Sequence, residues 1–136
     1  KILDGVFDIY MPDVKYADEK VAQRLSKAKD YFSVVKEALV EMHRQVGDLV
    51  LDEHGIALRG MIVRHLVLPN GLAGTDKIAN FIAEKISKNT YFNIMVQYRP
   101  CYKADEYPQV DRCPTVKEYK FAVKTIKDKG LTRLAR

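Results

Sequence analysis

The chain has 136 residues, of which 47% are hydrophobic and 30% charged, a composition that suits one globular domain and excludes disordered and fibrous classes. No apolar run is long enough to span a bilayer and no basic start leads into an apolar segment, so we expect a cytoplasmic chain that does not bind membranes. The net charge is +5, but the basic residues are spread along the chain and do not cluster with aromatic ones, which favours small anionic ligands over nucleic acid.

The start of the chain and its two cysteines limit the functions that the chain could have by itself. The segment Lys1–Gly5 resembles the middle of a loop, which favours a piece of a larger protein, although a trimmed tag gives the same pattern. Cys101 and Cys113 could form a disulfide, but two reduced thiols are the preferred interpretation in a cytoplasmic chain. Two thiols hold neither a four-cysteine zinc site nor the three-cysteine anchor of an iron–sulfur cluster.

The first half of the chain begins with a strand signal and continues with helices. The short strand Val6–Met11 is expected to close at Pro12, which has no N–H for a ladder. A short helix is expected over residues 18–26. Asp30 then resembles an N-cap, and apolar residues keep helical spacing until Gly47 ends a longer helix.

The second half opens with a hairpin predicted over residues 49–58. Met61–Leu68 is the strongest strand signal, and its nearly unbroken apolar run is typical of a strand buried on both faces. The next predicted element is a helix capped by Thr75, and the strand Tyr91–Gln97 comes after it. A capping box at residues 115–118 opens a last helix.

Strands that alternate with helices predict an α/β fold with three parallel strands, helices and an inserted β-hairpin. No repeat or linker divides the sequence, so residues 1–136 are interpreted as a single domain. Three parallel strands alone would leave a vulnerable sheet edge. We therefore expect the chain to be part of a larger barrel or doubly wound sheet.

Charged residues stand near the ends of the predicted strands, where parallel sheets bind ligands. Asp13 and Lys15 point the same way in an extended chain and could hold the ammonium and carboxylate groups of a ligand; a strand-end salt bridge is the alternative. Arg64 interrupts an apolar strand. It either anchors a substrate or cofactor carboxylate with its planar fork or pairs with an acid on a neighbouring strand.

The last predicted strand has a polar face. Asn93, Met95, Gln97 and Arg99 alternate with apolar residues, which indicates a barrel lumen or a pocket wall; a half-exposed edge strand is the alternative. The three histidines have no spacing typical of metal ligands, so we expect no metal site in this chain.

Three segments of the chain resemble a known family. Asp8–Tyr16, Ile62–Gly71 and Asn93–Tyr102 are similar to the second half of radical S-adenosylmethionine proteins related to the pyruvate formate-lyase activating enzyme, closest to an uncharacterised activating-enzyme-like subgroup. The likeness covers nearly the whole chain. It implies half of a partial TIM-like (β/α)6 barrel, of which this chain supplies strands four to six and lacks the N-terminal iron–sulfur half.

The resemblance also implies the chemistry of the whole protein. Its cofactors would be S-adenosylmethionine and a 4Fe–4S cluster, and its partners a flavodoxin or ferredoxin as electron donor and a glycyl-radical protein as substrate. In the family, an electron from the cluster cleaves S-adenosylmethionine, and the resulting radical abstracts hydrogen, in the activating enzymes from a glycine. The CxxxCxxC loop that holds the cluster is absent here, so no catalytic residue is expected in this part and the chain alone should be inactive.

The family's motifs map onto single residues of this chain. Asp13 and Lys15 resemble the DxK motif of strand four and Arg64 the arginine of strand five, so these three are expected to bind the cofactor. Tyr98 and Arg99 fall where activating enzymes have a Tyr-His pair, and Arg99 departs from that histidine. The candidate cavity-lining residues are Asn93, Gln97, Tyr98 and Arg99.

Two other interpretations stay open. An aldolase-like barrel fragment would use Lys15 as a Schiff-base amine, although the carboxylate of Asp13 nearby favours the charged form of that amine. A non-catalytic interaction module would instead pack its open sheet edge on a partner.

Overall fold

Five strands form one open sheet around a long central strand. The computed structural model describes residues 2–135. The strands are β1 (Ile9–Tyr10), β2 (Asp13–Val14), β3 (Val50–Leu51), β4 (Ala57–Leu66) and β5 (Tyr91–Met95). β1, β2 and β5 run parallel to β4, and only β3 pairs with it antiparallel. The α/β fold, the parallel strands and the hairpin are therefore confirmed.

The two edges of β4 have different partners. On one edge, Gly60 N donates to Asp8 O and Arg64 N donates to Pro12 O, which joins β4 to β1 and β2. On the other edge β4 pairs with β3 and β5, and Val67 N extends the second ladder by donating to the carbonyl of Met95. β4 thus holds the whole sheet together.

The first predicted strand differs from the observed one. The sequence predicts one strand over Val6–Met11 that ends at Pro12. The structure instead has two short strands, β1 before Pro12 and β2 after it. Proline lacks a donor yet keeps its carbonyl, which here accepts the N–H of Arg64, so the chain continues beside β4 beyond the proline. This continuation places Asp13 within the sheet instead of in a loop after it.

Four helices accompany the sheet, as predicted. They are α1 (Glu19–Ser26), α2 (Tyr31–Val46), α3 (Thr75–Lys85) and α4 (Val116–Asp128), with short 3-10 turns η1 (Pro69–Gly71) and η2 (Ala104–Glu106). Among residues 2–135, no helix is both long enough and apolar enough to cross a membrane.

Of the three predicted N-caps, Asp30 and Thr115 occupy the cap positions of α2 and α4, whereas the cap predicted at Thr75 is wrong. The box of Thr115 and Glu118 opens α4 as expected. Asp30, however, makes no side-chain cap; the carboxylate of Glu19 instead accepts the N–H groups of Phe32 and Ser33 at 3.2 and 2.9 Å. The cap position of α3 belongs to Gly74, which adopts a left-handed conformation, and the Thr75 hydroxyl is used elsewhere.

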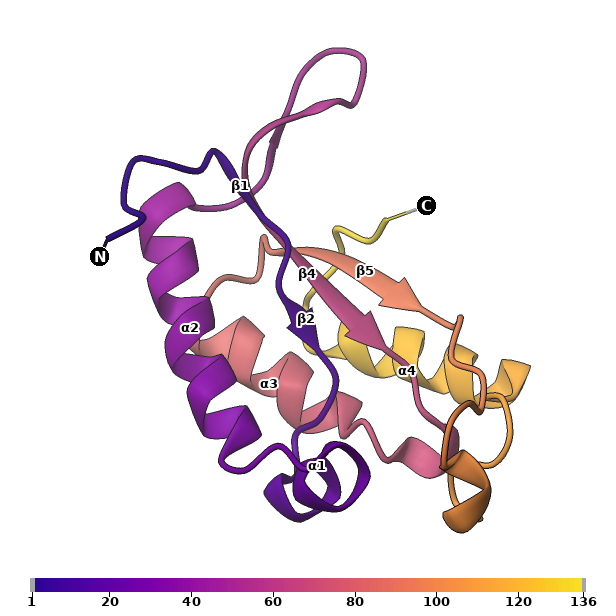
Figure 1. Cartoon of the computed structure of the whole chain (residues 1–136). Coiled ribbons are helices and arrows are strands. Elements are labelled where there is room, and N and C mark those ends of the chain that lie inside the picture. The colour runs from indigo at the N-terminus through magenta and orange to yellow at the C-terminus, as the bar shows by residue number, and fades with distance from the viewer. Residues whose placement is uncertain (1, 136) are drawn as a thin grey trace.

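The core lies on one face of the sheet only. The helices α2, α3 and α4 lie on one side of the sheet (Figure 1). Along β4, Met61, Val63 and His65 are buried under them, whereas Ile62, Arg64 and Leu66 on the opposite face are half-buried. The prediction that this strand is buried on both faces is therefore wrong. Figure 1 shows the hairpin projecting from one end of the sheet and α1 lying at the other, beyond the end of β2.

Candidate functional site

A row of polar side chains crosses three neighbouring strands on the uncovered face of the sheet. The register sets Asp13 of β2 beside Arg64 of β4, and Arg64 beside Asn93 of β5. Registered residues of parallel strands project to the same face, so these three side chains lie next to one another. Lys15 follows directly after β2. Four residues that the sequence singled out are thus brought together.

An ion pair joins the first two members of the row. Arg64 Nε donates to Asp13 Oδ1 at 2.6 Å, and Lys15 Nζ lies 3.4 Å from Asp13 Oδ2. The hydrogen bond from Arg64 is the main reason why the pKa of Asp13 lies below its usual value, and the same bond raises the pKa of Arg64. The alternative in which Arg64 pairs with an acid on a neighbouring strand is what the structure shows. Ligand binding by these residues stays a prediction.

The ion pair is accessible from solvent and keeps donors to spare. The three side chains expose between 30% and 44% of their surface, so a ligand can reach them. Within the described residues, no hydrogen bond engages the two terminal nitrogens of Arg64 or the side-chain amide of Asn93. A guanidinium held through Nε can still offer its terminal nitrogens to a carboxylate or phosphate.

Tyr31 at the start of α2 positions the charged pair. Its hydroxyl accepts the N–H of Lys15 at 3.0 Å and donates to the carbonyl of Asp13 at 3.2 Å. Burial raises the pKa of Tyr31, so the hydroxyl keeps its proton near neutral pH. In the sequence, Tyr31 is only one of the residues with helical spacing ahead of Gly47, and that spacing does not indicate a contact with β2.

The other predicted cavity-lining residues lie off the row. The ladder of β5 ends at Met95 because β4 itself ends at Leu66 and offers no further partner, so the predicted polar face of Tyr91–Gln97 is shorter than expected. Gln97 and Arg99 are exposed beyond the strand. Tyr98 is half-buried, and its hydroxyl donates to Val110 O at 2.8 Å.

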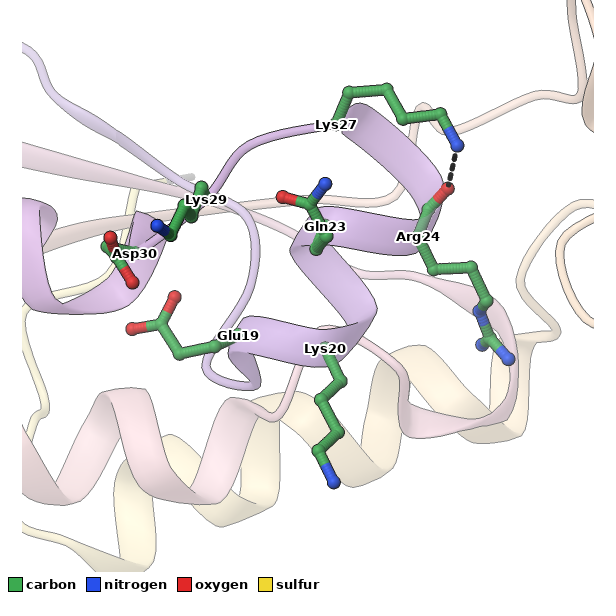
Figure 2. A pocket seen from close by; sticks show the side chains of 7 residues that line it. All are labelled: Glu19, Lys20, Gln23, Arg24, Lys27, Lys29 and Asp30. Atoms are coloured by element: carbon green, nitrogen blue, oxygen red, sulfur yellow. Dashed lines mark hydrogen bonds between the residues drawn. The ribbon is translucent and has the colours of Figure 1, made fainter.

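A hollow beside α1 is lined mostly by charged residues, but their side chains do not point toward a common centre (Figure 2). It measures about 700 Å³ and is lined by Glu19, Lys20, Gln23, Arg24, Lys27, Lys29 and Asp30. In Figure 2 the Lys20 and Lys27 side chains point away from each other, while Glu19 is occupied with capping α2. These groups do not converge on one point, so the row on the sheet remains the better candidate site.

A buried histidine lies on the opposite face of β4 from the row. His65 is fully buried, with Nδ1 2.8 Å from Val14 O and Nε2 2.9 Å from the Thr75 hydroxyl. A carbonyl only accepts, so Nδ1 carries the proton and the unprotonated Nε2 accepts from Thr75. Burial lowers the pKa of His65, which favours this neutral form. The histidine therefore joins β2, β4 and α3 as a structural residue.

Comparison with known proteins identifies a relative of unknown role. The uncharacterized protein MJ0674 of Methanocaldococcus jannaschii is 39% identical over 123 residues, which are 90% of this chain and 32% of the relative. The chain thus spans about a third of the length of that protein. No family model matches the chain. No solved structure matches it either.

Proposed function

We propose that this chain is the C-terminal half of a radical S-adenosylmethionine barrel of the kind that activates glycyl-radical proteins. The observation that carries the proposal is the row of Asp13, Arg64 and Asn93 on the uncovered face of a parallel sheet. The electron donor of flavodoxin or ferredoxin type and the glycyl-radical substrate belong to the proposal for the whole protein.

The asymmetry of the sheet supports a barrel fragment. In β/α barrels the helices cover the outer face, while side chains on the inner face meet those of other strands. Here α2, α3 and α4 cover one face, and Ile62, Arg64 and Leu66 stand on the other. Further strands of a longer protein would close that face into a lumen. The much greater length of the relative is consistent with such a protein.

The donor groups of this chain suit one cofactor and not the other. The Arg64 fork and the neighbouring Asp13 and Lys15 have the charges that the carboxylate and ammonium of S-adenosylmethionine require; the bound cofactor would supply the hydrogen-abstracting group. A 4Fe–4S cluster does not fit, because Cys101 and Cys113 are the only thiols of this chain. In addition, residues 2–135 contain no group of three His, Cys, Asp or Glu side chains that could hold a metal ion. Cluster ligands would have to come from residues outside this chain.

In this proposal the chain binds and orients the cofactor. Asp13 holds the Arg64 guanidinium through Nε, so the two terminal nitrogens stay available to a ligand. Tyr31 fixes the backbone on which Asp13 and Lys15 stand. Since these groups are already in place, little conformational entropy is lost when a ligand binds.

The test uses the whole protein that contains this chain. After anaerobic reconstitution with iron and sulfide, reduction in the presence of S-adenosylmethionine should produce 5′-deoxyadenosine, which chromatography measures. Asp13→Asn and Arg64→Lys should each lower its rate of formation about tenfold or more, because each removes a charge or a planar fork at the site. Arg59→Lys, the same exchange on the same strand but outside the row, should leave the rate unchanged.

Two results would overturn the proposal. One is a gene that encodes no CxxxCxxC motif ahead of this chain. The other is a reconstituted protein with an intact cluster that forms no 5′-deoxyadenosine. Circular dichroism of each variant separates a loss of binding from a loss of folding.

The aldolase-like alternative has less support. A Schiff base needs a free lysine amine, but Lys15 Nζ forms an ion pair with the Asp13 carboxylate at 3.4 Å. Borohydride trapping of a carbonyl compound on Lys15 would favour it.

A further inference from the structure

A second cavity lies beyond the carboxyl ends of the strands, apart from the polar row. It measures about 370 Å³, within the range of small-molecule pockets. Tyr16 after β2, Leu68 after β4 and Tyr98 after β5 form its inner wall, and the end of α1 faces the segment 101–110 across it. Ligands of α/β proteins bind at this end of the sheet.

The lining of this cavity has an unusual composition. Four tyrosines and three cationic residues line it, and none of its lining residues is Asp or Glu. Of the cations, Lys103 pairs with Glu106 at 3.4 Å. Within residues 2–135, no ion pair engages Arg24 or Lys27; Arg24 Nη2 donates to the neutral amide of Gln109 at 2.6 Å. The cavity is therefore electropositive.

Two of the lining tyrosines have hydroxyls that the protein satisfies; Tyr16 is buried, with 9% of its surface exposed, and Tyr98 is half-buried. The Tyr16 hydroxyl bonds to Ser26 Oγ at 2.8 Å, and the Tyr98 hydroxyl donates to Val110 O at 2.8 Å. Both rings are thereby fixed. Fixed aromatic side chains provide stacking surfaces for planar rings at a small cost in entropy.

Tyr102 at the mouth of the cavity has a strained backbone. Its φ is 56°, a left-handed conformation that is rare for a bulky residue, although 92% of its surface is exposed and no core packing compensates. Lys103 Nζ lies 6.0 Å from the centre of its ring. An exposed aromatic ring in this position can cover a ligand that enters the cavity.

We propose that this cavity binds a nucleoside monophosphate. The base would stack against Tyr98 and Tyr102, and the positive charges of Arg24 and Lys27 would attract the phosphate. The proposal is independent of the proposed function, since it requires neither an iron–sulfur cluster nor S-adenosylmethionine. That compound carries a sulfonium and an ammonium group, which this electropositive cavity disfavours.

The test is calorimetric titration, with AMP, GMP, UMP and CMP, of the whole protein that contains this chain. At least one nucleotide should bind saturably, and its nucleoside and ribose 5-phosphate should each bind at least about tenfold more weakly, because each lacks one of the two recognised groups. A higher salt concentration should weaken binding of the nucleotide and leave binding of the nucleoside unchanged. S-adenosylmethionine should not displace the nucleotide.

Two substitutions remove ligand contacts without straining the fold. Lys27 and Tyr102 both have positive φ, which asparagine and glycine tolerate well, so Lys27→Asn and Tyr102→Gly should keep the melting temperature. Each substitution should weaken binding of the nucleotide about tenfold. The controls Lys120→Gln and Phe121→Ala, on the exposed face of α4 outside this cavity, should change nothing. No saturable binding by any of the four nucleotides, equal binding of the nucleoside, or full binding by both variants would each overturn the proposal.

Discussion

At the scale of single residues, His65 links the stability of the fold to pH. The folded chain holds this imidazole neutral between a carbonyl and a hydroxyl and keeps it out of water. The unfolded chain exposes it, with a pKa near 6.5. Because burial depresses the folded pKa, the unfolded state binds the proton first as the pH falls.

The free energy of unfolding should therefore decrease as the pH falls below about 6.5, by up to about 1.4 kcal/mol per pH unit, and level off below the folded pKa. Urea unfolding between pH 7.5 and 5 measures this slope. His65→Asn should lose the slope, whereas His54→Gln, at an exposed histidine of the hairpin, should retain it. A slope that persists in His65→Asn would contradict the assignment.

Part of the polar row could be predicted from the sequence. Asp13, Lys15 and Arg64 could be placed together because they resemble cofactor-binding motifs of the radical S-adenosylmethionine family. Their register could not, since it depends on the Pro12 carbonyl meeting the N–H of Arg64. Gln97 fell outside because polar and apolar residues keep alternating after the ladder has ended.

At the scale of elements, β4 passes very close to the chain segment before β3. Gly60 has φ +115°, and a Cβ at this position would lie 2.4 Å from the carbonyl oxygen of Asp48. Both the backbone angle and the space thus require glycine. The same close approach allows β4 to pair with β1 on one edge and β3 on the other.

Gly60→Ala should lower the free energy of unfolding by about 3 kcal/mol or more, since backbone strain and a backbone clash add. Gly55→Ala is the matched control. Gly55 also has positive φ, but nothing lies within 4 Å of its added Cβ, so only the backbone cost of about 1 kcal/mol is expected. Urea unfolding of both variants gives the comparison, and equal losses would show that the contact with Asp48 is unimportant.

The elements themselves were largely predictable, but the groups that cap α2 and α3 were not. Spacing of apolar residues predicted α2, and the local Thr115 box predicted the start of α4. The cap of α2 comes from Glu19, on a different helix, and the Thr75 hydroxyl is taken by His65. Such contacts depend on tertiary packing, which local sequence patterns do not contain.

At the scale of the whole molecule, Glu118 anchors the long segment after β5. Its carboxylate accepts from both terminal nitrogens of Arg112, at 2.8 and 2.7 Å, from Asn70 N at 2.7 Å, and from Thr115 N at 2.7 Å. The hydrogen bonds from Arg112 are the main reason why the pKa of Glu118 lies well below its usual value. One side chain thereby joins α4, η1 and the segment that precedes α4.

Glu118→Ala should cost about 1 to 3 kcal/mol and should speed amide hydrogen exchange across residues 98–114. Glu118→Gln separates the two roles, because glutamine keeps an acceptor for the cap but loses the charge that Arg112 binds. It should therefore speed exchange in that segment while costing less stability than alanine. Unchanged exchange in both variants would mean that the segment is held by other contacts.

The α/β class follows from the order of elements, but the uncovered face of the sheet could not be read from the sequence. Ile62 and Leu66 are as apolar as the buried Val63, so the pattern of Met61–Leu68 does not distinguish a covered face from an open one. Only the packing of the helices reveals the difference.

The central position of β4 also governs the order in which the chain can fold as it is synthesised. Residues 2–56 are synthesised before any residue of β4 exists, so β1, β2 and β3 have no partner during that time. Pairing of Ile9 with Gly60 then closes a loop of about fifty residues, whereas β3 needs only a tight turn. The hairpin is therefore expected to form first, and β1 and β2 to join late. Until β5 emerges, one edge of β4 stays open to other nascent chains.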